Sequence, residues 1–77
     1  MNDSLKEKKQ FWKNVRHLQS FHDILNKELA YEIGYSTHGF ECAKYHNKLT
    51  VEMAIKISKF LNESLDDLFY KDFSKHY

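Results

Sequence analysis

The chain has 77 residues, of which 42% are hydrophobic and 16% aromatic, which suits one folded domain whose core is too small for a deep catalytic cavity. Its 12 basic and 11 acidic residues give a net charge of +1, so its overall charge provides no strong attraction to nucleic acid. A single cysteine excludes an internal disulfide, and no apolar run reaches the length of a signal-peptide core or a membrane span, so we expect a cytoplasmic protein that does not engage a membrane.

Helical periodicity is the only regular pattern in the chain, which contains no proline and no repeat, and we therefore predict an all-α fold. The first helix is expected over Ser4–His22, with apolar residues on one side and basic residues on the other. The run Lys6–Lys9 has two interpretations, a solvated helix face or an arm that contacts phosphate. The predicted inner face is Phe11, Trp12, Val15, Leu18, Phe21 and His22, opposite Lys8, Lys9, Lys13 and Arg16.

A second, short helix is predicted to begin at Asn26, whose side chain would cap it, and to end at Gly34 in the left-handed conformation. Only three residues, Gly34–Ser36, then join it to the next helix. So sharp a turn needs a residue without a Cβ at its tightest point, and this pattern is typical of a helix-turn-helix. The residues expected to face inward are Leu29, Ala30 and Ile33.

Three further helices are predicted from capping residues that precede apolar positions. Ser36 would cap the third helix, Thr50 the fourth, and Ser64 with Asp67 the fifth, which gives five helices in all. Their expected inner residues are Phe40 and Ala43 in the third helix, Val51, Ala54, Ile55, Ser58 and Leu61 in the fourth, and Leu65, Leu68 and Phe69 in the fifth.

The segment LNKELAYEIGYSTHGFECAKYHNKLTVEMAIKISKFLNESLDDLF resembles the helix-turn-helix domain of the Xre family, the Cro/C1-type phage-repressor regulators. The match runs from about Phe11 to Phe69. Its most specific parts are ELAYEIGYS, which is similar to the family pattern ELAxxxGVS, and TVEMAIKISKFLNESLDDLF, which is similar to the last two helices with their SLDELF ending. The resemblance implies one five-helix, phage-repressor-like domain over residues 1–77, with a core of about 11–69 and an aromatic tail at 70–77.

The sequence differs from the family pattern at the contact between the first and third helices, at the end of the first helix and in the loop after the third. In many members an arginine late in the first helix pairs with a glutamate at the end of the third, whereas this chain has Gln19 and Lys44, so we expect the brace to be missing. The glycine that commonly ends the first helix is Asp23. The loop HNKL is about one residue shorter than usual and lacks the common proline, so the resemblance supplies no phosphate contacts there.

The resemblance implies a transcriptional regulator, expected to be a repressor, whose third helix enters the major groove of double-stranded DNA. The side of that helix opposite its core residues carries no arginine or lysine, so the common bidentate contact of a basic side chain with guanine is not available from it. Lysines at the rim, Lys27, Lys44 and Lys48, would then supply the attraction to phosphate. The candidate DNA-binding residues are Asn26, Lys27, Ser36, Thr37, His38, Glu41, Cys42, Tyr45, Asn47 and Lys48.

Several of these residues have a second, structural interpretation. Ser36 and Thr37 suit phosphate or base contacts, and His38 suits guanine or phosphate. Glu41 would accept from the amino group of cytosine or serve as a solvated carboxylate of the helix, and Tyr45 would contact the DNA backbone or pack within the protein. The weakly basic third helix also leaves a different function open, that of a phage-type antirepressor or other inhibitor that uses the same fold to bind a protein.

Catalytic and metal-binding functions find little support in the sequence. No constellation of nucleophile, base and orienting group is evident, so we expect neither an enzyme nor a cofactor. His38, Cys42 and His46 follow one another at spacings of four and would suit zinc if the helix extended that far, but no fourth ligand stands at a usual spacing, and we expect no metal site.

The C-terminal tail continues an aromatic pattern beyond the expected last helix. One interpretation is that Phe69 and Phe73 fold back onto Phe11 and Trp12 of the first helix. The other is that the aromatic residues form a surface for self-association, and we expect a homodimer through this region that reads two half-sites. The stripe consists of Phe69, Tyr70, Phe73 and Tyr77.

Overall fold

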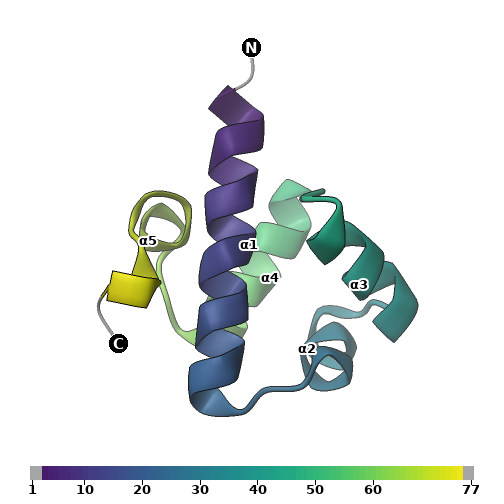
Figure 1. Cartoon of the computed structure of the whole chain (residues 1–77). Coiled ribbons are helices and arrows are strands. Elements are labelled where there is room, and N and C mark those ends of the chain that lie inside the picture. Colours follow the sequence, from purple (N-terminus) through teal and green to yellow (C-terminus); the bar gives the residue numbers. More distant parts are fainter. Residues whose placement is uncertain (1–2, 76–77) are drawn as a thin grey trace.

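The computed structural model describes residues 3–75, which form helices around a shared core and contain no β-strand (Figure 1). The predicted all-α fold and its five helices are therefore confirmed, and a short 3-10 helix, η1, follows them. Within the same residues, no helix is both long enough and apolar enough to cross a membrane. The elements are α1 (Asp3–His22), α2 (Asn26–Ile33), α3 (Thr37–Tyr45), α4 (Val51–Leu61), α5 (Leu65–Tyr70) and η1 (Phe73–Lys75).

The long helix α1 runs through the middle of the molecule (Figure 1). In the view of Figure 1, α5 and η1 lie to one side of α1, the α2–α3 pair lies to the other, and α4 passes behind. The apolar side chains of all five helices and η1 meet between these elements and supply most of the stabilisation by burial. The core consists of Phe11, Trp12, Val15, Leu18, Leu29, Ala30, Ile33, Phe40, Met53, Ala54, Ile57, Leu61, Leu68 and Phe73.

The predicted inner faces of α1 and α4 are wrong at four positions. Phe21 is 56% exposed and His22 is also exposed, because α1 extends past the core in its last turn. Val51 is 77% exposed, and Ile55 also lies at the surface. The apolar residues of α4 span more than half of its circumference, so periodicity alone did not identify which side packs inward. The contacts of α4 with α2 and α5 select the side that carries Met53, Ala54, Ile57, Ser58 and Leu61.

Three of the predicted helix caps are confirmed and one is wrong. The hydroxyl oxygens of Ser36, Thr50 and Ser64 accept hydrogen bonds from backbone N–H groups three residues ahead, at 3.0, 3.1 and 3.0 Å. The cap position of α2 is Leu25, whose backbone N–H donates to the Glu28 carboxylate at 2.8 Å. Asn26 is instead the first residue of α2, which leaves its side chain available for contacts with other helices.

The first four helices end with the same backbone motif. In α1, α2 and α4 the residue directly after the helix takes the left-handed conformation, and in α3 the second residue after the helix does so. The N–H of the residue that follows the left-handed one donates to the carbonyl of the residue five positions earlier in the chain. The left-handed residues are Asp23, Gly34, Asn47 and Asn62, with φ of 57°, 79°, 56° and 58°. The predicted left-handed conformation of Gly34 is confirmed, and because an added Cβ there would meet nothing within 4 Å, glycine suits the position through its positive φ.

The C-terminal segment folds back onto α1, as one of the two interpretations predicted. The Phe69 ring lies 5.0 Å from the Phe11 ring, and Phe73 is buried. Asn14, which is 0% exposed, connects the segment to α1 by hydrogen bonds. Its side-chain amide donates to the backbone carbonyls of Leu68 and Lys71 at 2.8 and 2.6 Å, and its oxygen accepts from the Phe73 N–H at 3.0 Å. The predicted role of Tyr77 lies outside the described residues.

Candidate functional site

The pair of helices α2 and α3 is held at a sharp angle by the joint Gly34–Ser36 (Figure 1). Gly34 reverses the chain after α2, and Ser36 caps the first turn of α3. The two helices contact each other along their inner sides, where Ala30 is buried. Burial of Phe40 against Trp12, with ring centroids 5.6 Å apart, fixes the side of α3 that faces the core. The opposite side of α3 is consequently presented to solvent.

Four of the candidate residues share this outward side of α3. Thr37, His38, Cys42 and Tyr45 are all exposed, and Tyr45 has 62% of its surface accessible. The Cys42 sulfur lies 3.5 Å from Nε2 of His38, one turn earlier in the helix. Ser36 is exposed at the N-terminal end of the same side, although its hydroxyl oxygen already accepts the capping hydrogen bond. These residues form a continuous polar surface, without a lysine or arginine, along α3.

Two other candidates, Asn26 and Glu41, are bound to each other across α2 and α3. The side-chain amide of Asn26 donates to the Glu41 carboxylate at 3.0 Å. Both side chains are half-buried. The second interpretation of Glu41, a solvated or helix-bonding carboxylate, did not include this contact with α2. A base contact from Glu41 would have to compete with this hydrogen bond.

The ion pair of the family pattern is absent, and Gln19 and Lys44 form a brace of different chemistry in its place, which the sequence did not predict. The Lys44 ammonium donates to Oε1 of Gln19 at 2.9 Å and to Oδ1 of Asn26 at 2.8 Å. The Gln19 amide completes the network by donating to the same Asn26 oxygen at 3.1 Å. A cation bound by two neutral amide oxygens replaces the two opposite charges of the family pattern. The network joins α1, α2 and α3, and therefore fixes the orientation of α3.

Lys44 was also expected to attract phosphate at the rim, and the structure contradicts this. The residue is buried, and its ammonium group is directed into the brace. Burial lowers the pKa of Lys44 below its ordinary value, the nearby Arg16 charge lowers it further, and the Glu41 carboxylate acts in the opposite direction. The rim lysines that remain exposed are Lys27 and Lys48.

The loop after α3 is tied to α1 through its backbone. Asn47 provides the left-handed residue that ends α3, a conformational role that the sequence analysis did not assign to it. The carbonyl of Lys48 accepts a hydrogen bond from the Trp12 indole N–H at 3.0 Å, while the Lys48 side chain extends to solvent. The short loop is thereby held in place without the proline that is common in the family.

Arg16 belongs to the site, although it was predicted only to lie on the side of α1 opposite the apolar residues. Its guanidinium group donates to the Lys44 carbonyl at 3.1 Å and lies 5.8 Å from the centre of the Tyr45 ring. Arg16 stands one turn before Gln19, and this spacing on a helix was the signal that could have placed both on the side facing α3.

The zinc alternative lacks a third ligand. His46 is the residue directly after α3, and it does not form a metal-binding group of three with His38 and Cys42. Among residues 3–75, no group of three histidine, cysteine or acidic side chains is placed to hold a metal ion. No family model, curated protein or solved structure matches this chain.

Proposed function

We propose that the protein binds double-stranded DNA through the outward side of α3 and represses transcription, as a helix-turn-helix regulator similar to the Cro/C1 type. The observation that carries the proposal is the α2–α3 unit. In this unit a three-residue joint connects two short helices. One side of α3 is held against the rest of the protein, and its opposite side is exposed. A helix presented in this way has the dimensions to enter the major groove, which is about 12 Å wide.

The chemistry of the exposed side suits contacts with both phosphate and bases. Thr37 lies in the first turn of α3, where free backbone N–H groups and the helix dipole favour an anion. His38 and Tyr45 offer a ring N–H and a phenol O–H to oxygen atoms of the groove. Lys27, next to Asn26, and Lys48, three residues after α3, are exposed and would contact phosphate beside the C-terminal half of α3.

A second function is favoured by one specific observation. The exposed side of α3 lacks arginine and lysine, and with Tyr35 and Tyr45 it combines aromatic rings and uncharged polar groups. Such a composition is typical of a surface that binds protein. Under this alternative, the fold serves as a scaffold for an inhibitor of another protein, and binding is insensitive to salt.

Selection from a pool of randomised duplexes, followed by titration at about 50 mM salt where phosphate contacts are strongest, tests the proposal. We expect an enriched sequence, and His38→Ala should weaken binding to it by about 1 to 3 kcal/mol while leaving binding to unrelated DNA nearly unchanged. His22→Ala provides the matched control, since His22 is exposed at the far end of α1. No enrichment, together with loss of a protein partner in the His38 variant, would favour the inhibitor function.

A further inference from the structure

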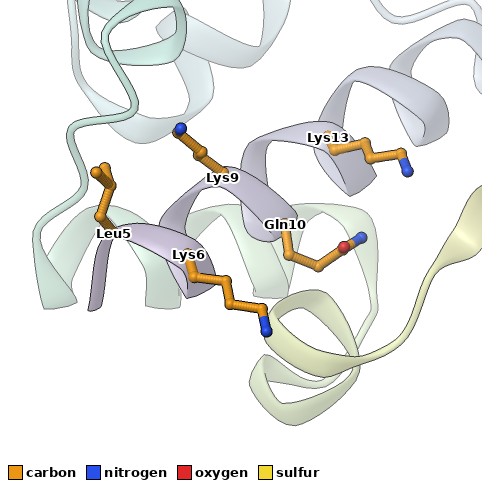
Figure 2. A pocket seen from close by; sticks show the side chains of 5 residues that line it. All are labelled: Leu5, Lys6, Lys9, Gln10 and Lys13. Carbon is orange, nitrogen blue, oxygen red and sulfur yellow. The ribbon is translucent and has the colours of Figure 1, made fainter. Parts of the chain in front are cut away.

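The outer side of α1 carries a row of basic residues that the proposed DNA contacts do not use. Lys6, Lys9, Lys13 and Arg16 follow at spacings of three, four and three, and all are exposed. These spacings place them on one side of the helix, and we call them the α1 basic row. Figure 2 shows the three lysines along one stretch of α1, where they line a shallow depression with Leu5 and Gln10.

The charges of the chain are distributed unevenly between α1 and the remaining residues. The 20 residues of α1 contain five basic and two acidic residues, which gives this helix a net charge of +3. The rest of the chain has seven basic and nine acidic residues, a net charge of −2. The overall charge of +1 therefore conceals a basic face. Within that face Lys13 pairs with Asp72 at 3.3 Å, whereas Lys6 and Lys9 extend the positive surface toward the N-terminal end of α1.

The α1 basic row reaches the candidate site at Arg16. This residue contacts the last turn of α3 through the Lys44 carbonyl and the Tyr45 ring. The exposed side of α3 and the basic side of α1 are consequently neighbours that meet at one residue. The same structure removes Lys44 from the rim, so the surface close to α3 has fewer free positive charges than the sequence predicted.

We propose that the α1 basic row is a second part of the proposed DNA interface, which binds the phosphates that flank the base pairs under α3. This inference rests on the proposed function. From Lys6 to Arg16 the row extends about 15 Å along the helix, close to the axial length of four nucleotides of one strand, about 14 Å. Charge complementarity favours phosphate as the ligand, and the junction at Arg16 favours the same duplex that α3 contacts.

The test compares two double variants that remove the same charge from different helices. Lys6→Gln/Lys9→Gln removes two positive charges from the α1 basic row. Lys56→Gln/Lys59→Gln removes two exposed charges from α4, which passes behind α1 in Figure 1. Binding of each to a 30-base-pair duplex of mixed sequence is measured by fluorescence anisotropy between about 50 and 200 mM salt, the range in which phosphate contacts change affinity most clearly.

We expect the α1 double variant to bind about fivefold or more weakly at 100 mM salt and to lower the slope of log K against log salt by about 1 to 2. The α4 control should match the wild type in both quantities. Equal thermal melting of the variants shows that folding is retained.

Two results would overturn the inference, and they are distinguishable. If the wild type binds DNA and the α1 variant has the same slope as the α4 control, the row does not contact phosphate, and the proposed function of α3 still stands. This result is also expected if the row binds an acidic protein. If the wild type binds no duplex at about 50 mM salt, both the inference and the proposed function fail.

Discussion

The ammonium group of Lys44 lies 2.9 Å from the side-chain oxygen of Gln19, so that a cation and a neutral amide tie the last turn of α3 to α1. Asn26 shares this contact from α2, and the three side chains hydrogen-bond to one another, with Gln19 and Lys44 buried and Asn26 half-buried. A buried cation is costly unless its donors are used, and here two amide oxygens accept from it. The orientation of α3 thus depends on polar geometry as well as on apolar packing.

Replacing Lys44 should therefore destabilise the protein. We expect Lys44→Ala to lower the free energy of unfolding by about 1 to 3 kcal/mol, because it removes the donor to the Gln19 oxygen and a packed side chain, while Asn26 keeps the hydrogen bond from the Gln19 amide. Urea denaturation followed by circular dichroism measures the change. Lys48→Ala, at an exposed position, should have little effect, and equal losses in the two variants would contradict the role of the brace.

The left-handed residues that end the helices differ in how well they suit that conformation. Gly34→Val should cost more than about 1 kcal/mol, because a β-branched residue is strained at the φ of 79°, even though the space beside it is open. Asp23→Gly should be neutral or stabilising by up to about 1 kcal/mol, because it relieves the strain at a φ of 57°. Thermal melting of both variants checks the sign of each change, and unaltered stability of Gly34→Val would exclude the assigned conformation.

Asn14 should be the polar residue on which the C-terminal segment most depends. Asn14→Ala leaves the Phe73 N–H and the Leu68 and Lys71 carbonyls without this partner, and we expect a loss of about 2 to 4 kcal/mol. Hydrogen exchange at the Phe73 amide should accelerate before the rest of the protein unfolds. Gln10→Ala serves as the control, since its amide contacts the same segment from a partly exposed position.

Asp72 makes the docking of that segment sensitive to acid. A hydrogen bond from the Ser74 hydroxyl, aided by the nearby Lys13 ammonium, lowers the pKa of Asp72 below its ordinary value of 3.8. The folded state therefore binds this proton less readily than the unfolded chain, and the resulting stability is present above pH 3.8 and lost as the pH falls through the lowered value.

Comparison of the wild type with Asp72→Asn tests this dependence. The wild type should melt at a higher temperature at pH 6, and the difference should shrink as the pH falls below 3.8. Glu32→Gln, at an exposed position on α2, is the control for a general effect of charge. A difference in melting temperature that stays constant with pH would show that Asp72 does not contribute in this way.

The proposed homodimer now rests on fewer residues than the aromatic pattern suggested. Phe69 and Phe73 pack within the chain, which leaves Tyr70, 69% exposed, as the aromatic residue of α5 available to a second copy. We predict a dimer in sedimentation at tens of micromolar, roughly the range in which a micromolar dimer forms, and a monomer for Tyr70→Glu. Tyr31→Glu, on the exposed side of α2, should leave the dimer intact. A wild-type monomer at this concentration would contradict the prediction.

The sequence predicted the parts of the fold that depend on local chemistry. Ser36, Thr50 and Ser64 were recognised as caps because a hydroxyl before a helix satisfies a nearby N–H, and Gly34 because glycine favours a positive φ. The inner side of α4 was not predicted correctly, because its apolar residues cover more than half of the helix circumference and only the contacts with neighbouring helices select the side that packs inward.

The site was less predictable than the fold, since its polar contacts join residues far apart in the chain. The pattern that the sequence resembles has an ion pair where this chain has Gln19 and Lys44, so the sequence suggested a missing brace. The hydrogen bond between these two residues depends on the relative positions of α1 and α3, which sequence spacing does not give. Asn14 was not singled out from the sequence, although an asparagine on the apolar side of a helix indicates that its side chain needs buried hydrogen-bond partners. Its backbone partners in the C-terminal segment are more than 50 residues away, and sequence spacing does not identify them.

The bond between Asn14 and the Phe73 N–H also has a consequence for synthesis of the protein. The ribosome makes α1 before η1, yet Asn14 on α1 binds the N–H of Phe73, which lies 59 positions later in the chain. During translation, Asn14 lacks this native partner until nearly all of the domain has emerged. Stable folding must therefore follow the synthesis of η1, and a chain arrested before Phe73 should be a substrate for proteases and chaperones that bind exposed apolar helices.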